Sequence, residues 1–220
     1  MKGVNRSAAK TRRSAGRPRE PAATRRNILA AATGEFAAGG LAGGRVDEIA
    51  RRAGVGKRML YHYFGNKEAL WLAVLEDAYA RIRGEERLLD VGRLLPREGM
   101  RRLVEFSIGY CEDNPDFVAL LIGENLNRAR HLRRSRRIRD MHVSLLAVIA
   151  GLLERGARAG VFRRGIDPAE LYITIAALGF FYFSNVHTLS VIFGRDLDAP
   201  AARRRHRRHA VDVILGYLRP

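Results

Sequence analysis

Two short amphipathic helices separated by a glycine are the most regular feature of this 220-residue sequence. In the first, between residues 45 and 53, apolar side chains recur at helical spacing: Val46, Ile49, Ala50 and Ala53. Gly54 follows them, where a helix often ends in a left-handed conformation that glycine adopts at little steric cost. The pattern therefore predicts a helix that stops at a tight turn.

The second helix is predicted to bury one face and expose the other. Its inward face comprises Met59, Leu60, Tyr63 and Phe64, and its outward face comprises Lys57, Arg58, Tyr61 and His62. A helix, a glycine turn and a second helix form the helix-turn-helix layout, whose second helix enters the major groove of DNA. The pattern thus indicates DNA binding.

The rest of the chain also reads as helices, with no convincing strand pattern. An apolar stripe predicts a helix over 24–39 with Thr24 as its N-cap, and another helix, with Asn66 as its N-cap, is expected to run to about Arg83. After a loop containing Gly92 and Pro96, five more helical patterns cover 98–113, 115–129, 136–159, 168–193 and 200–218, and Asp167 is the expected N-cap of the fourth. We predict an all-α protein of about nine helices.

This pattern divides the chain into three parts. Residues 1–22 lack apolar periodicity and read as a basic arm that is disordered when free. Residues 23–83 are expected to form a small DNA-binding domain, and residues 84–220 a second helical domain.

One stretch of the second domain, residues 171–193, carries no formal charge. Its length would allow a membrane span, but polar residues crowd its second half: Asn185, His187, Thr188 and Ser190. Burial inside the protein is therefore the favoured interpretation. A helix that is apolar nearly all round must be covered on several sides, which we expect to be the core and an identical subunit.

Charge strengthens the DNA-binding interpretation. The formal net charge is +17, and residues 1–67 hold 15 of the 40 basic residues but only 4 of the 23 acidic ones. An arginine-rich proteome would explain part of this excess but not its concentration in the first third. A polyanionic partner is indicated, with nucleic acid favoured over an anionic membrane surface.

Catalytic and metal-binding patterns have little support. We find no HExxH, GxSxG or P-loop motif, and the single cysteine, Cys111, reads as a small buried hydrophobe. His206 and His209 lie in a basic run that is hostile to metal cations. The sequence therefore predicts no enzyme activity, no metal and no cofactor. One cysteine and the lack of an apolar leader fit a cytoplasmic protein.

The run IARRAGVGKRMLYHYFGNKEAL, residues 49–70, resembles the signature of the TetR family of transcriptional regulators. The matching positions, at family spacing, are Ala53-Gly54-Val55, Leu60-Tyr61, Tyr63-Phe64, Lys67 and Leu70. The strong resemblance covers about residues 22–82, and the rest aligns loosely with a TetR-type C-terminal domain. The resemblance implies a dimeric, ligand-responsive DNA-binding regulator, usually a repressor, on a pseudo-palindromic operator.

Two positions depart from the family pattern. Gly56 stands where the family usually has a Ser or Thr that caps the recognition helix, and glycine is a weaker but accepted N-cap. Arg45 stands where a Thr usually contacts the DNA backbone. An arginine also reaches phosphate, so the register on DNA, rather than binding itself, is what this departure affects.

The resemblance and the outward helix face together supply the candidate DNA contacts. They are Arg45, Gly56, Lys57, Arg58, Tyr61, His62, Tyr63 and Lys67. Arg58 can contact phosphate or a guanine edge, and Tyr61 and His62 stand where family members contact phosphate and bases. Core packing is an equally good interpretation of Tyr63.

The segment Gly16-Arg17-Pro18-Arg19 resembles the arms that enter minor grooves. Arg17 and Arg19 would meet the enhanced negative potential of a narrow, A·T-rich groove. The alternative is a solvated basic tail that raises only non-specific affinity.

The resemblance also implies an effector pocket in the second domain. Its candidate lining residues are Phe106, Tyr110, Phe117, Leu121, Asn125, His142, Leu146, Tyr172, Phe180 and His187. Ordinary core packing competes with this interpretation at each position. Asn125 and His187 are the more informative members, since they are polar in apolar surroundings. A mainly apolar effector is indicated.

In TetR-like proteins the last two helices form a four-helix dimer interface. We therefore expect a homodimer through about 168–193 and 200–218, with the basic run 203–208 solvated at its rim. One rival is a non-specific, architectural nucleic-acid-binding protein driven by the basic arm. The other is a helical protein that binds anionic membranes. The regulator hypothesis, which expects double-stranded DNA as partner and no membrane association, is preferred.

Overall fold

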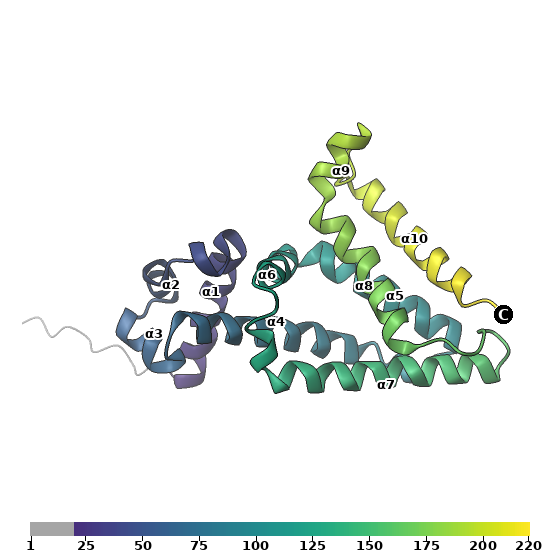
Figure 1. Ribbon diagram of the computed structural model, residues 1–220, viewed down its shortest axis with the longest axis horizontal. Coiled ribbons are helices and arrows are strands. Elements are labelled where there is room, and N and C mark those ends of the chain that lie inside the picture. Colours follow the sequence, from purple (N-terminus) through teal and green to yellow (C-terminus); the bar gives the residue numbers. More distant parts are fainter. Residues whose placement is uncertain (1–19) are drawn as a thin grey trace, which may run out of the picture.

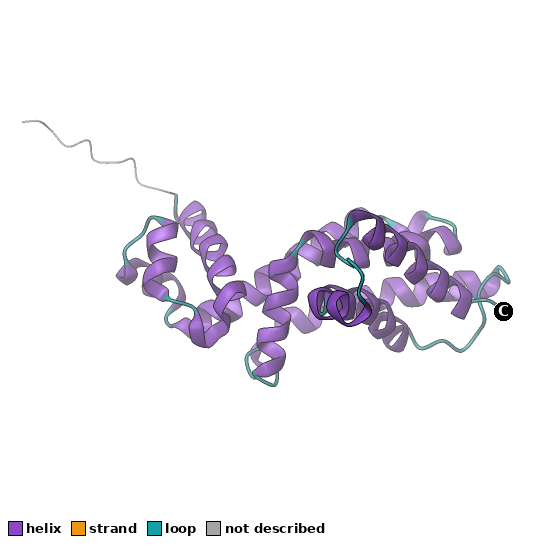
Figure 2. Ribbon diagram, turned by 90° about the horizontal axis from the view of Figure 1, so that it is seen from above, coloured by secondary structure: helices purple, strands orange, loops and turns teal. Residues whose placement is uncertain are grey.

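The computed structural model describes residues 20–220, and these form ten α-helices, two short 3-10 turns and no strand (Figures 1 and 2). The helices are α1 (Pro21–Gly43), α2 (Val46–Ala53), α3 (Lys57–Phe64), α4 (Lys67–Leu88), α5 (Pro96–Asp113), α6 (Pro115–Leu126), α7 (Arg136–Arg158), α8 (Pro168–Ser184), α9 (Val186–Phe193) and α10 (Pro200–Tyr217). The all-α prediction is confirmed. Arg17 and Arg19 lie outside the described residues.

Helices α1, α2 and α3 gather at one end of the molecule, and α4 runs from them into the remaining helices (Figure 1). There α5 packs against both α8 and α10, while α7 packs against α4 and α8. Helix α6 turns back towards the first three helices and packs extensively on α1. The two ends of the molecule are thus joined twice, by α4 and by the α1–α6 contact.

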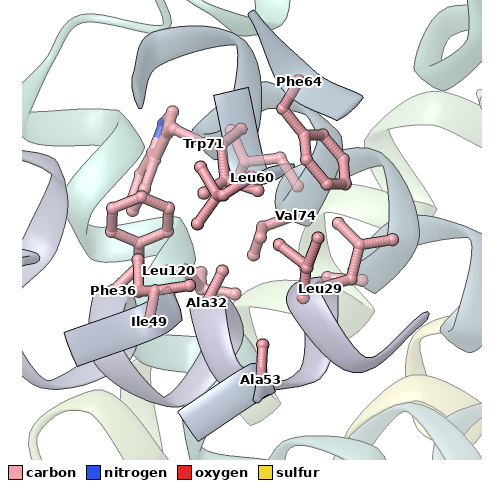
Figure 3. Packing of buried hydrophobic residues seen from close by; sticks show 14 of the residues in the cluster. Leu29, Ala32, Phe36, Ile49, Ala53, Leu60, Phe64, Trp71, Val74 and Leu120 are labelled. Atoms are coloured by element: carbon pink, nitrogen blue, oxygen red, sulfur yellow. The ribbon is translucent and has the colours of Figure 1, made fainter. Parts of the chain in front are cut away.

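Apolar side chains form two buried clusters. The first fills the space between α1, α2, α3 and α4, where Phe36, Leu60 and Trp71 are almost completely buried (Figure 3). It continues into the second half of the chain through Tyr110, Phe117, Leu120 and Ile138. The second cluster lies between α5, α7, α8 and α10. The first hydrophobic cluster therefore crosses residue 83, the predicted boundary between the two domains.

The start of α1 differs from the prediction. The helix begins at Pro21 with Glu20 as its N-cap, because proline suits the first turn. Thr24 was expected as the N-cap, but it is buried and its hydroxyl donates to the Glu20 carbonyl oxygen at 3.4 Å. At the other end Gly40, with φ 62°, interrupts the helical path one residue after the predicted stop.

The predicted single helix 168–193 is wrong, because the chain breaks at Asn185 into α8 and α9. The Asn185 side-chain amide donates to the Phe181 carbonyl oxygen and to the Ser184 hydroxyl, both at 2.9 Å. Such local bonds compete with the helical backbone ladder. Within residues 20–220 no single helix is long and apolar enough to cross a membrane. Helices α8 and α9 reach that length and composition only as a pair bent by 71°.

The basic run on α10 was expected to be solvated, and this is wrong for half of it. Arg203 and Arg207 are partly buried and reach Glu112 on α5 at 3.6 and 2.5 Å. His206 stacks on Tyr182 with 3.9 Å between ring centroids. These three positions share one helix face, and that face packs on α5 and α8. Only the remaining three arginines of the run are exposed.

Replacing Gly156 by alanine should destabilise the fold. A Cβ at Gly156 would lie 1.9 Å from Cδ2 of the buried Phe162 ring, so the substitution overpacks the end of α7. We expect the free energy of unfolding to fall by about 1–3 kcal/mol in urea titrations. Gly151→Ala, on the same helix with no atom within 4 Å of the added Cβ, should instead add about 0.5–1 kcal/mol. Equal changes in both variants would contradict the packing.

Candidate nucleic-acid interface

The turn between α2 and α3 has the conformation that the sequence predicts. Gly54 is left-handed, with φ 64° and ψ 38°, and its N–H closes the end of α2 on the carbonyl oxygens of Ala50 and Arg51. Helix α3 then begins after Gly56, which is extended and leaves the helix without a side-chain cap. The first amides of α3 therefore present the positive end of a short helix at the surface.

One face of α3 packs on the core and the other is open. Leu60 and Phe64 are buried one turn apart. Met59 was expected on the inward face, but it is 47% exposed. An eight-residue helix needs only the two positions one turn apart to hold it on the core, and Met59 falls beside that narrow stripe. The exposed face therefore includes one more residue than expected.

The side chains expected on the outward face are all exposed: Lys57, Arg58, Tyr61 and His62. Tyr63 is half-buried, and its ring packs against those of His62 and Phe64 at 5.8 and 6.4 Å. Tyr63 also packs against the first hydrophobic cluster. Its environment supports core packing more than direct DNA contact.

Four of the candidate DNA-binding residues line a single surface depression of about 540 Å3: Arg45, Lys57, Tyr61 and Lys67. Arg45 comes from the residue before α2, two of the others from α3, and Lys67 from the start of α4. Residues far apart in sequence are thus brought together around one concavity. Arg58 and His62 lie outside it, on the same exposed helix.

Carboxylates hold several cations of this surface in place. Asp47 accepts from Lys57 Nζ at 3.1 Å, and this bond raises the pKa of the lysine. Glu35 accepts the backbone N–H of Arg45 at 3.1 Å and lies 3.6 Å from its Nε. Hydrogen bonds from Arg51 and Arg52 lower the pKa of Glu48 to about 2. These ion pairs therefore orient the cations of this surface.

Lys67 occupies the junction of α1 and α4. Its Nζ donates to the carbonyl oxygen of Ala42 at 3.1 Å. Asn66 caps α4 as the sequence predicts, because its Oδ1 accepts the Ala69 N–H at 2.8 Å. A cation in the first turn is unfavourable for the helix dipole, and the carbonyl bond offsets part of that cost.

The second domain brings together some of the candidate effector residues. A chain of aromatic rings joins Phe106, Tyr110 and Phe117 at 5.7 and 5.4 Å. It continues through Tyr79, at 5.7 Å from Phe117, to His142 at 5.2 Å. His142 is in turn 6.1 Å from Tyr172. Burial lowers the pKa of His142, so this ring is neutral at pH 7.

Other candidates lie elsewhere. Asn125 is exposed and bonds the Leu121 carbonyl oxygen at 2.9 Å, so its expected apolar surroundings are wrong. His187 is also exposed, beside a separate hollow that reaches Glu112. Leu121 packs against the first hydrophobic cluster, and Phe180 and Leu146 are partly buried. The candidates that line hollows are thus divided among separate ones: Phe106 and Tyr110 line one, Tyr110 and Phe117 a second, and His187 a third.

Two buried charged groups were missed. Arg83 and Glu86 are 4% and 8% exposed and form an ion pair at 2.8 Å. Arg83 lies one turn after Tyr79 on the inward face of α4 and one turn before Glu86. That spacing, with charges on an otherwise apolar stripe, is the signal that could have located them.

Glu124 is the third missed charge, and its carboxylate accepts from Trp71 Nε1 at 2.7 Å. It also accepts the backbone N–H groups of His131 and Leu132 and contacts His131 Nδ1. Burial raises the pKa of Cys111 to about 11, which makes its thiol unreactive at neutral pH. Among residues 20–220, no group of three or more His, Cys, Asp or Glu could hold a metal ion.

A helix-turn-helix at one end of an all-helical chain, beside a second helical domain with an apolar core, is typical of a DNA-binding regulator. Two family models support this class: "Bacterial regulatory proteins, tetR family" matches residues 28–74, and "Tetracyclin repressor-like, C-terminal domain" matches residues 96–214.

Individual proteins support the same conclusion. The HTH-type transcriptional repressor NicS of Pseudomonas putida is 36% identical over 209 residues, which cover 95% of this chain and 99% of the relative. A tetR-family regulatory protein from Rhodococcus RHA1 has the same fold, with a TM-score of 0.69 over 91% of this chain and 98% of that one, at 22% identity. The putative transcriptional regulator SCO4942 of Streptomyces coelicolor has the same fold, with a TM-score of 0.66 over 90% of this chain and 99% of that one, at 24% identity.

The chain belongs to the TetR family of helix-turn-helix transcriptional regulators. Proteins of this family bind DNA and small effectors, typically as dimers, and they are not enzymes. The predicted family and regulatory function are confirmed, and the architectural alternative is not favoured.

Proposed function

We propose that the protein is a dimeric repressor that binds a pseudo-palindromic operator and releases it when an effector occupies the second domain. The depression lined by Arg45, Lys57, Tyr61 and Lys67 carries this proposal. Arg51 also lines it, so four cations and a phenol lie there together with two carboxylates, Asp47 and Glu48. The excess of cations beside a short exposed helix suits one phosphate backbone along a major groove. Chromosomal DNA as the target puts the protein in the cytoplasm.

In this proposal Arg58 and His62 contact base edges, since they lie on α3 outside the depression that would receive the backbone. Lys57 and Lys67, which line that depression, then contact its phosphates. Asp47 and Glu35 orient Lys57 and Arg45 before DNA arrives, so less side-chain freedom is lost on binding. Arg17 and Arg19 would extend the contacts into an adjacent minor groove.

Homodimerisation is proposed through the outer surface of α8, α9 and α10. Large apolar side chains are exposed along this surface: Ile173, Phe181, Val191, Ile192, Phe193, Val213 and Tyr217. The three helices lie together at the end of the molecule away from α3 (Figure 1). An exposed apolar surface of this extent is typical of an interface, and a two-fold dimer would present two α3 helices to half-sites about one helical turn apart.

The test is fluorescence anisotropy on DNA that the protein itself selects from genomic fragments. We expect Arg58→Ala and Tyr61→Ala each to weaken binding of the dimer by about 30- to 25,000-fold, or about 2–6 kcal/mol, because each substitution removes a contact of about 1–3 kcal/mol from both half-sites. Arg164→Ala is the matched control, because this exposed arginine follows α7 at the far end of the molecule. Equal binding to selected and shuffled DNA, unchanged in both α3 variants, would overturn the proposal.

A further inference from the structure

A cavity of about 230 Å3 opens where α4, the turn after it, α5 and α7 meet. Much of its wall is apolar and is supplied by Leu103, Met141, Leu145 and Val148. The remaining wall is polar, with Arg83 and Glu86 from α4 and Ser144 from α7. An apolar cavity with a few converging polar groups is the usual form of a small-molecule site.

Arg83 is the unusual member of this lining, because it is a cation that is 4% exposed. Its Nη2 donates to the Tyr172 hydroxyl at 3.5 Å, which is long, and its guanidinium lies 5.6 Å from the centre of that ring. Its Nη1 is 2.8 Å from Glu86 Oε2 but is not aligned for a hydrogen bond, and Nε has no hydrogen-bond partner. Most of the five donors of the guanidinium are therefore unused.

Beyond Glu86 and Tyr172, the surroundings of Arg83 do not supply the missing acceptors. Arg87 and Asp90 lie at the cavity margin and are exposed, so water screens both charges. Burial raises the pKa of Tyr79 to about 12 and lowers that of His142, so both groups are neutral at pH 7. Burial also raises the pKa of Glu86, so its carboxylate is protonated more readily than an exposed one.

The buried side-chain atoms of this wall that have no hydrogen-bond partner are Arg83 Nε and Nη1, and both are donors that point to an anionic ligand. A carboxylate offers two acceptor oxygens in one plane and matches the fork of a guanidinium. We propose that this cavity is the effector site, and that the effector is a small organic acid whose carboxylate pairs with Arg83. Its apolar body contacts Leu103, Met141 and Leu145. This inference rests on the proposed ligand-responsive function and specifies the ligand class.

The position of Arg83 also connects the site to DNA. Helix α4 runs from Lys67 to Leu88, so one helix carries both the proposed phosphate contact and the proposed carboxylate contact. Its first turns pack against α3. A ligand that draws Arg83 away from Glu86 displaces the last turns of α4 and thereby changes the orientation of α3.

The experiment uses the full chain and pairs of aromatic acids with their neutral amides: benzoate and benzamide, phenylacetate and phenylacetamide, 1-naphthoate and 1-naphthamide. Binding is measured by calorimetry and by thermal shift. We expect at least one acid to bind tenfold or more tightly than its amide and to release operator DNA. Arg83→Gln should remove that preference, while Glu86→Gln should strengthen binding of the acid.

Arg81→Gln is the matched control, because Arg81 is exposed on the same helix and pairs with Asp77. This substitution should change neither the affinity for the acid nor the preference for the acid over its amide. If Arg83→Gln fails to fold, Glu86→Gln still decides, since a weaker or unchanged preference for the acid contradicts the inference. Equal binding of every acid and its amide overturns it. DNA binding by the ligand-free protein tests the proposed function separately, so the two failures are distinguishable.

Discussion

Trp71→Ala is expected to lower the free energy of unfolding by about 3–5 kcal/mol, the range for truncating a large buried aromatic side chain. Trp71 is completely buried and meets the Phe36 ring edge-on at 5.2 Å. Its Nε1–H donates to Glu124 at 2.7 Å. The substitution therefore opens a cavity and also removes a partner from a buried carboxylate, which adds to the loss.

Urea unfolding followed by circular dichroism measures this effect, because Trp71 is the only tryptophan and its fluorescence disappears with it. Glu124→Gln in both backgrounds completes a double-mutant cycle. The glutamine oxygen can still accept from Trp71, so the coupling free energy measures the extra strength of a bond to a charged acceptor, and a value near zero would contradict it. Leu88→Ala is the control. This side chain is 84% exposed at the end of the same helix, so the change should stay within about 0.5 kcal/mol.

The buried Glu124 carboxylate should also make the free energy of unfolding depend on pH. Burial alone would raise the pKa of Glu124, but the hydrogen bonds from Trp71, Leu132 and His131 lower it overall. A lowered folded-state pKa contributes stability above the unfolded-state pKa, and that contribution is lost as pH falls through the folded-state value. Wild-type stability should therefore fall more steeply than that of Glu124→Gln as the solution is acidified.

Operator affinity is expected to fall by about 10³- to 10⁵-fold between 50 and 200 mM salt, the range for about six to ten phosphate contacts. The cations around the α3 depression occur twice in a dimer, which is why the number of contacts is large. Anisotropy titrations at several salt concentrations give the slope of log affinity against log salt.

Lys57→Ala should reduce that slope by about 1.8, because each lost phosphate contact contributes about 0.9 and the dimer loses two. Arg164→Ala, far from α3, should leave the slope unchanged. A wild-type slope near zero would show that phosphate contacts do not hold the complex together.

The features that sequence predicted correctly depend on residues within a few positions of one another. The left-handed turn at Gly54 and the caps at Asn66 and Asp167 are decided by local backbone chemistry. Asp167 Oδ1, for example, accepts the Ala169 N–H at 2.6 Å. The amphipathic pattern of α2 and α3 is equally local, and it predicted the exposed face of α3 correctly apart from Met59.

The errors arose where distant packing decides the outcome. Arg83 and Glu86 were missed: the inward stripe of α4 can be seen in the sequence, but α5 and α7, which enclose these charges, are brought there only by the fold. Arg207 was read as solvated, since its partner Glu112 lies 95 residues away. In the run 171–193 apolar composition concealed the break at Asn185, whose side chain turns back on the preceding turn.

The contact between α1 and α6 has a consequence for how such regulators diversify. The first hydrophobic cluster contains Phe36 and Ile49 from the helix-turn-helix region together with Leu120 from α6. A recombination that exchanged only residues 20–66 with those of a relative would place a foreign α1 against the original α6. A working chimera would therefore have to carry α1 and α6 as a matched pair.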